Sequence, residues 1–156
     1  MKNTIKEEVK RINNLMSLKE EDGMGHYMDS TYLKTPEQAG IDVESTDAII
    51  LDTLKDAISH NMKLVMIRPE YVETARNFID SEGANVLVGT VIDFPYGNGS
   101  VTDKVQEAQE AIDNGVDELD YVVDYRAFLR GNRDKVTEEI KKGTEVGLNN
   151  GKTVKW

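Results

Sequence analysis

Short apolar runs alternate with amphipathic segments along the chain, and this alternation constrains the fold more than any other feature. Three runs predict buried strands, at residues 63–67 (KLVMI), 86–94 (VLVGTVIDF) and 118–123 (ELDYVV). Weaker strand signals lie at 26–33 and 153–156. Successive strand midpoints are roughly 23 to 37 residues apart, the spacing of strand–crossover–strand units. Because no two-residue hairpin turn joins neighbouring runs, the sequence predicts an α/β fold with a parallel sheet.

The segments between these runs carry the 3.6-residue periodicity and the start signals of helices. Thr35, followed by Pro36 and Gln38, forms a capping-box pattern, and Ser100 with Asp103 forms another. The next predicted helix after the first box begins at Ser45 or Thr46. Helices are therefore expected over residues 2–19, 35–40, 45–60, 69–81, 101–114 and 134–148.

Charge and composition exclude several classes of protein. The chain has 29 acidic and 19 basic side chains, a formal net charge of −10, which argues against sequence-independent nucleic-acid binding and against an anionic lipid surface. No apolar run approaches the roughly 20 residues of a membrane-spanning helix, and the first residues lack the apolar core of a secretory signal. Without cysteine there are no disulfides and no thiolate ligands. We expect a cytoplasmic protein, with a leading helix and linker over residues 1–25 and one α/β unit over 26–156.

Candidate functional residues gather where the predicted strands end. In parallel α/β folds these carboxyl ends carry the chemistry, and Asp29, Asp93, Asp120, Asp124 and Lys155 lie at or near them. Asp120 stands inside an apolar strand, so its carboxylate needs a compensating cation. Lys155 is the lysine expected near the end of a neighbouring strand, and we predict that it supplies that charge.

Several of these residues also suit less specialised roles. Asp93 and Asp124 fit turn formers or helix caps, and Asp29 fits local hydrogen bonding. Lys155 fits a solvated terminal lysine, and Lys104, one turn into a predicted helix, is expected to be solvated. No histidine or carboxylate spacing points to a metal site, so no metal is expected.

The residues alone leave two functions open. One is amine or proton chemistry on a carbonyl compound. Another is a non-catalytic flavodoxin-like phospho-acceptor or binding module, with Asp93 as acceptor beside Lys155 on the fifth strand.

Four segments resemble a known enzyme family. The combination of an FP-x-G loop, a DELD strand and a YRAFLxGN continuation is similar to the deoxyribose-phosphate aldolases. The resemblance runs from Tyr27 to Trp156, and the stretch around 36–45 looks like an insertion. The matching segments are YMDSTYLK (27–34), LVMIRPEYV (64–72), VGTVIDFPYGNG (88–99) and DNGVDELDYVVDYRAFLRGN (113–132).

The resemblance implies a (β/α)8 barrel and a class I aldolase without metal or cofactor. Such an enzyme cleaves 2-deoxyribose 5-phosphate to acetaldehyde and glyceraldehyde 3-phosphate through a Schiff base, and homodimers are common in the family. Carried over by motif, Asp120 moves protons, Lys155 helps to set the electrostatics, and Asp29 lines the substrate site.

The same resemblance implies that the sequence holds only part of the family's site. The Schiff-base lysine of the family lies on the sixth strand and its pKa-lowering neighbour on the seventh, both beyond Trp156. Ser30, Met66 and Arg68 stand where relatives often carry His, Cys and Asn. We therefore expect the N-terminal part of a barrel, with about four β/α units and the start of the fifth strand, inactive by itself. A half-barrel that dimerises and serves only as a scaffold is the third possibility.

Overall fold

The structure is a computed structural model, and it describes residues 23–156. Five strands form one parallel sheet in the spatial order β1-β2-β3-β4-β5. This confirms the predicted parallel α/β class and a strand within each predicted segment. The helix predicted over residues 2–19 lies outside the described residues, and the boundary at residue 25 stays a prediction. The strands are β1 (Asp29–Tyr32), β2 (Leu64–Ile67), β3 (Leu87–Ile92), β4 (Glu118–Tyr121) and β5 (Thr153–Lys155).

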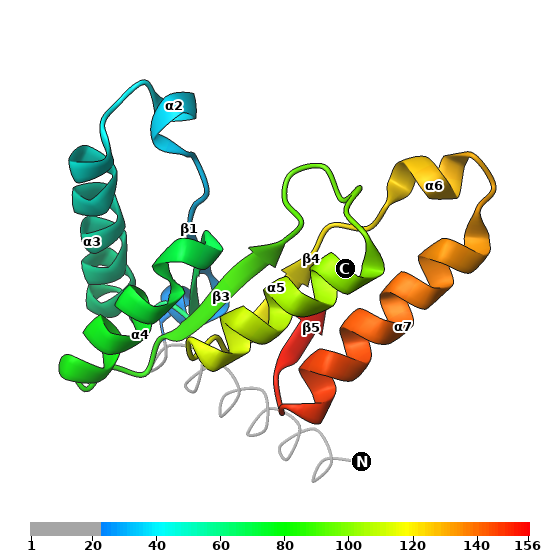
Figure 1. The fold of residues 1–156 in the computed structure, drawn as a ribbon. Helices are drawn as coiled ribbons and strands as arrows, with labels where there is room; N and C mark the ends of the chain where they lie inside the picture. Colours follow the sequence, from blue (N-terminus) through cyan, green and yellow to red (C-terminus); the bar gives the residue numbers. More distant parts are fainter. Residues whose placement is uncertain (1–22) are drawn as a thin grey trace, which may run out of the picture.

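The helices cover one face of this sheet and follow one another around it (Figure 1). In contact with the strands, α3 packs on β1 and β2, α4 and α5 pack on β3, and α7 packs on β5. The helical elements are η1 (Met24–Tyr27), α2 (Pro36–Ala39), α3 (Val43–Ser59), η2 (Pro69–Tyr71), α4 (Val72–Ser81), α5 (Val101–Asp113), α6 (Tyr125–Leu129) and α7 (Arg133–Asn149). The sequence periodicity missed α6, because its five residues are too short to show a helical repeat.

Helix starts follow the capping chemistry of the sequence. The capping boxes at Thr35 and at Ser100 are both present, which confirms those two starts. The predicted start of α3 at Ser45 or Thr46 is wrong by two or three residues. Asp42 is the N-cap, because its carboxylate accepts a hydrogen bond from the Ser45 amide at 2.8 Å.

Alternate strand residues point to opposite faces of the sheet, and the two faces differ in chemistry. The face under the helices is the main core and is almost entirely apolar. The other face holds a small apolar cluster of Leu64, Met66 and Val91, against which Leu33 and Phe94 pack. β2 is buried along its whole length, as its uninterrupted apolar run predicts. The strand residues in the main core are Val65, Ile67, Val88, Ile92, Leu119 and Tyr121.

The sheet is strongly curled, with the helix-free face on the inside. Lys155 Nζ on β5 lies 3.6 Å from Asp29 Oδ2 on β1, although these are the first and the last strands of the sheet. In a flat sheet, four strand spacings would separate them by roughly 19 Å, beyond the reach of the two side chains. Sequential strand order with this curl is the geometry of a β/α barrel. A flavodoxin-like sheet has the order 2-1-3-4-5, so the phospho-acceptor alternative does not have the fold that it requires.

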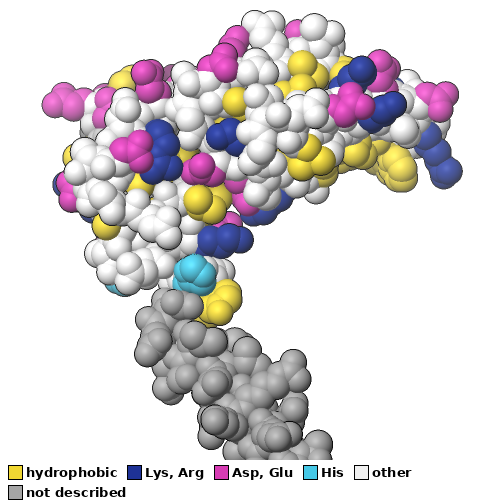
Figure 2. All heavy atoms as spheres, turned by 90° about the horizontal axis from the view of Figure 1, so that it is seen from below, with side chains coloured by type: hydrophobic (Ala, Val, Ile, Leu, Met, Phe, Trp, Pro, Cys, Tyr) yellow, Lys and Arg dark blue, Asp and Glu magenta, His cyan; other side chains and the backbone are white. Residues whose placement is uncertain are grey.

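The surface carries both signs of charge. On the face drawn in Figure 2, Lys and Arg side chains are interspersed with acidic and hydrophobic ones and form no continuous basic area. Within residues 23–156, no helix has the length and apolar character needed to cross a membrane.

Close packing of α7 on β5 gives a stability prediction for Gly147. A Cβ at this position would overlap Cγ2 of Val154, which is branched and cannot move aside. We expect Gly147→Ala to lower the free energy of unfolding by about 1–3 kcal/mol, measured by urea denaturation. In a Val154→Ala background the same change is expected to raise it by about 0.5–1 kcal/mol, because alanine favours the helix. Stabilisation in the native Val154 background would contradict this packing.

Candidate active site

A pocket of about 340 Å³ lies on the concave face of the sheet and extends to the carboxyl ends of the strands. All three residues predicted for the site, Asp29, Asp120 and Lys155, line it. The structure therefore brings together side chains from the first, fourth and fifth strands. The remaining lining is mostly apolar and consists of Thr31, Leu33, Met66, Val91, Phe94 and Val122.

Lys155 is surrounded by carboxylates. Its Nζ lies 2.5 Å from Glu118 Oε1 and 3.6 Å from Asp29 Oδ2. The Glu118 carboxylate raises the pKa of Lys155 above the ordinary lysine value, and the charges of Asp29 and Asp120 raise it further. Lys155 is therefore a protonated cation near neutral pH, suited to electrostatic stabilisation rather than to nucleophilic attack.

Two details of the predicted site are corrected by the structure. The closest carboxylate to Lys155 is that of Glu118, whose side chain is 4 % exposed, and Asp120 acts on the cation from farther away. Asp29 begins β1 rather than standing near its carboxyl end. Sequence reasoning missed Glu118, although its spacing of two residues from Asp120 places both on the same face of β4.

The two other strand-end aspartates have the simpler roles left open by the sequence. Asp124 is the N-cap of α6: its Oδ1 accepts a hydrogen bond from the Ala127 amide at 2.8 Å, and Lys135 Nζ lies 2.5 Å from Oδ2. Asp93 has a positive φ of 55° and shapes its loop by accepting a hydrogen bond from the Gly99 amide at 2.7 Å.

The expectation that Lys104 is solvated is wrong. Its side chain is 2 % exposed and pairs with Glu139 of α7, which is equally buried. Lys104 lies in the first turn of α5, on the side that faces α7 and the loops after β3 and β4. The helical periodicity of α5 does not predict that α7 and these two loops pack against this side of the helix.

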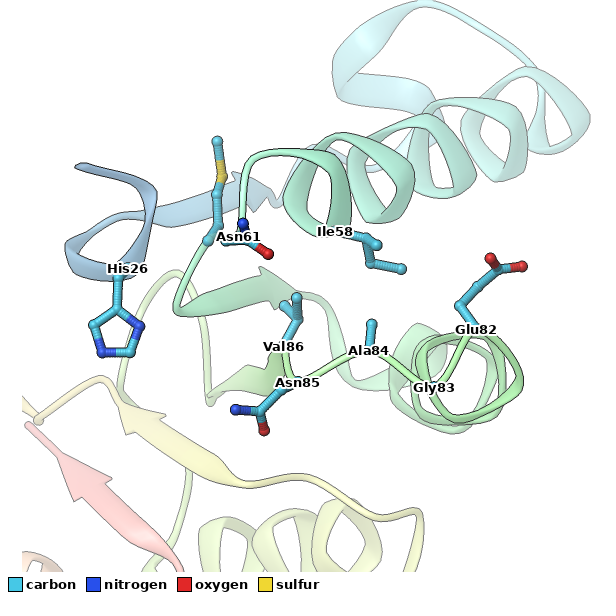
Figure 3. Close-up of a pocket in the computed structure, with 9 residues that line it drawn as sticks. His26, Ile58, Asn61, Glu82, Gly83, Ala84, Asn85 and Val86 are labelled. Atoms are coloured by element: carbon cyan, nitrogen blue, oxygen red, sulfur yellow. The ribbon is translucent and has the colours of Figure 1, made fainter. Parts of the chain in front are cut away.

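A larger pocket, of about 490 Å³, lies elsewhere (Figure 3). It is formed by His26, by the last turn of α3 and the residues that follow it, and by those between α4 and β3, at the amino ends of β2 and β3. Because barrel enzymes carry their chemistry at the carboxyl ends, we assign the candidate site to the smaller pocket. Within residues 23–156, no three histidine, aspartate or glutamate side chains cluster as metal ligands.

Comparison with known proteins agrees with this fold. No family model matches the chain. The curated deoxyribose-phosphate aldolase of Caldicellulosiruptor saccharolyticus is 33 % identical over 120 residues, which are 77 % of this chain and 50 % of that protein. The Acholeplasma laidlawii deoxyribose-phosphate aldolase is 42 % identical over 106 residues, 67 % of this chain and 46 % of the relative.

A solved structure shares the fold. The deoxyribose phosphate aldolase of Aeropyrum pernix, described as tetrameric, superposes with a TM-score of 0.65 at 22 % identity, covering 81 % of this chain and 48 % of that one. The chain spans about half the length of the curated relatives that it matches.

The curled parallel sheet, with its polar site on the concave face, defines a part of a β/α-barrel protein. Sequence and fold together then show that the chain is similar to the N-terminal part of the deoxyribose-phosphate aldolases.

The carboxylates around Lys155 give a titration prediction. Glu118→Gln is expected to lower the pKa of Lys155, because it removes the charge that most stabilises the ammonium form. The ¹³Cε shift of Lys155, followed by NMR from pH 8 to 12, measures this change. Glu73→Gln, an exposed change on α4, is the control and is expected to leave that pKa unaltered. An unchanged pKa in Glu118→Gln would refute the assigned cause.

The Asp124 cap gives a prediction on stability and pH. Asp124→Ala is expected to cost about 1–2 kcal/mol of unfolding free energy at pH 7, because α6 loses its N-cap and Lys135 loses its partner. The bond to Lys135, with that from Ala127, lowers the pKa of Asp124 below 3.8. The ionised Asp124 carboxylate therefore contributes its full share of the unfolding free energy above pH 3.8. This share, and with it the difference between the parent and Asp124→Ala, is lost as the pH falls through the lower pKa of the folded state. Urea unfolding at several pH values tests this, with exposed Asp56→Ala as the control.

Proposed function

We propose that these residues form part of the active site of a 2-deoxyribose-5-phosphate aldolase, a carbon–carbon lyase. The observation that supports this most directly is that Asp29, Asp120 and Lys155 line one pocket on the concave face, with Glu118 paired to Lys155. The named relatives add the reaction, since the two reported above are deoxyribose-phosphate aldolases.

In the proposed reaction a neutral lysine amine attacks the substrate carbonyl, and loss of water gives a Schiff base. Cleavage of the carbon–carbon bond releases glyceraldehyde 3-phosphate, and protonation and hydrolysis of the remaining enamine release acetaldehyde. Lys155 does not fit the attacking amine, because its carboxylate neighbours keep it protonated. By family resemblance, the attacking lysine comes from a strand outside this sequence, so we propose that the 156 residues alone are inactive.

Each residue of the cluster has a proposed part. Asp120, at the pocket wall, transfers protons during formation and hydrolysis of the carbinolamine. The Lys155 ammonium stabilises negative charge on reacting oxygens, Glu118 holds that ammonium in place, and Asp29 lines the substrate site. No metal or cofactor enters this scheme.

The cellular setting follows from the same proposal. We propose a phosphorylated sugar as the substrate, a cytoplasmic location because phosphorylated sugars do not cross membranes freely, and a role in deoxyribonucleotide and carbohydrate catabolism. We also propose a homodimer, as is common in the family, and the described tetramer of the Aeropyrum pernix protein shows that one relative self-associates.

Asp120→Asn tests the proposed proton transfer. In the complete protein that carries this sequence, we expect kcat for cleavage of 2-deoxyribose 5-phosphate to fall about 100-fold or more, because an amide cannot take up the proton. Coupled detection of glyceraldehyde 3-phosphate gives the rate, and borohydride trapping followed by intact mass gives the Schiff-base adduct. Asp52→Asn, with a side chain 81 % exposed on α3, is the matched control. Full turnover in Asp120→Asn would contradict the assigned role, and absence of adduct in the unaltered protein would contradict the reaction.

A further inference from the structure

Lys104 joins the two loops that follow β3 and β4. Its Nζ donates to the Gly97 carbonyl at 3.0 Å and to the Val122 carbonyl at 2.7 Å. Gly97 lies in the loop between β3 and α5, and Val122 directly follows β4. One ammonium group, buried under α5, therefore ties together loops that are 25 residues apart along the chain.

The carboxylates that neutralise Lys104 hold the same two loops. Glu139, on α7, accepts hydrogen bonds from the Asp124 amide at 3.1 and 3.3 Å. Asp93 Oδ2 lies 3.3 Å from Lys104 Nζ and also accepts the Gly99 amide. Lys104 and Glu139 are each 2 % exposed, so water does not compete for these bonds.

The tied loops form part of the candidate site. Phe94 and Val122 line the pocket, and Val122 stands two residues after Asp120. The loops also touch closely at Gly97, where φ is +63° and an added Cβ would lie 2.5 Å from the Val123 carbonyl oxygen. A shift of either loop would therefore move the wall of the pocket beside Asp120.

We propose that Lys104 is a positioning residue for the aldol reaction: through Gly97 and Val122, it sets the placement of Phe94, Val122 and Asp120 around the substrate. It touches no reacting atom. This inference rests on the proposed function and adds a residue on α5 to the machinery of that site. A misplacement of about 1 Å can cost about 100-fold in rate, so a buried tie of this kind has a measurable effect on turnover.

The test separates positioning from folding by a double variant. Lys104→Met alone leaves the buried Glu139 carboxylate without a counter-charge and is expected to impair folding. Lys104→Met/Glu139→Leu removes both charges and replaces them with apolar side chains of similar size, so no unpaired charge of this pair stays buried. Its melting temperature is expected to fall, because backbone groups lose their partners, but to stay above the assay temperature, which thermal unfolding checks. Lys142→Met, at an exposed ion pair on α7, is the matched control.

Two measurements on the complete protein read out the double variant. Amide hydrogen exchange at Gly99 is expected to rise at least 10-fold, because Asp93, which accepts this amide, loses its ion pair with Lys104. Exchange at Asp124 does not report on Lys104, because Glu139→Leu removes the acceptor of that amide directly. kcat for 2-deoxyribose 5-phosphate is expected to fall at least 10-fold with a smaller change in KM, because positioning acts on the transition state. Lys142→Met is expected to change neither.

The outcomes separate this inference from the proposed function. Faster exchange with lowered kcat in a stably folded double variant supports the positioning role. Unchanged exchange would show that Lys104 does not hold the two loops in place. Faster exchange with unaltered kcat would show that the loops are held but that this does not matter for the reaction. If the unaltered protein does not cleave the substrate, the proposed function fails on that ground and the positioning role fails with it, while exchange still decides whether Lys104 holds the loops.

Discussion

The contact between Lys155 and Asp29 is the constraint on which the site depends, because it exists only if the sheet is curled. The two side chains come from opposite ends of a five-stranded sheet and lie 3.6 Å apart across its concave face. Burial of the Glu118 carboxylate would be costly without a cation, and Lys155 supplies one 2.5 Å away. The curl and the polar cluster therefore support each other: curvature brings the charges together, and their pairing stabilises polar groups inside an otherwise apolar concavity.

Much of the fold could be predicted from the sequence, and the reasons are local. Apolar runs such as 63–67 and capping boxes such as that of Thr35 act within a few residues, so periodicity and spacing reveal them. The short helix α6 and the cap at Asp42 depend on local hydrogen bonds that compete with one another, and sequence pattern alone does not rank them. Asp120 and Lys155 could be assigned to one site because parallel strands share a carboxyl edge, whereas Asp29, at the start of β1, could be added only because its motif resembles that of a known family.

The parts that sequence reasoning missed are tertiary. Glu118 could have been found from its alternation with Asp120, but Lys104 could not, since its partners lie on α7 and on two loops. A charged pair that is 2 % exposed on both sides gains little stability over an apolar pair of the same size. The pair does provide directional contacts. The Lys104 ammonium fixes the positions of two carbonyls and two carboxylates relative to one another, whereas apolar side chains would not fix the relative position of the two loops.

Two lysines, one buried and one partly buried, have different surroundings, and neither environment suits a nucleophile. Lys104 is fully buried, and its ammonium group is hydrogen-bonded to oxygens of the protein. It can therefore affect a ligand only through the backbone segments that it contacts. Lys155 is 42 % exposed toward the pocket, and its carboxylate neighbours keep it protonated while leaving its charge within reach of a ligand. A lasting cation beside a reacting centre favours the neutral form of a nearby amine, because two ammonium groups repel each other. The acids around Lys155 therefore suit a site in which one lysine keeps its proton so that another can lose its own.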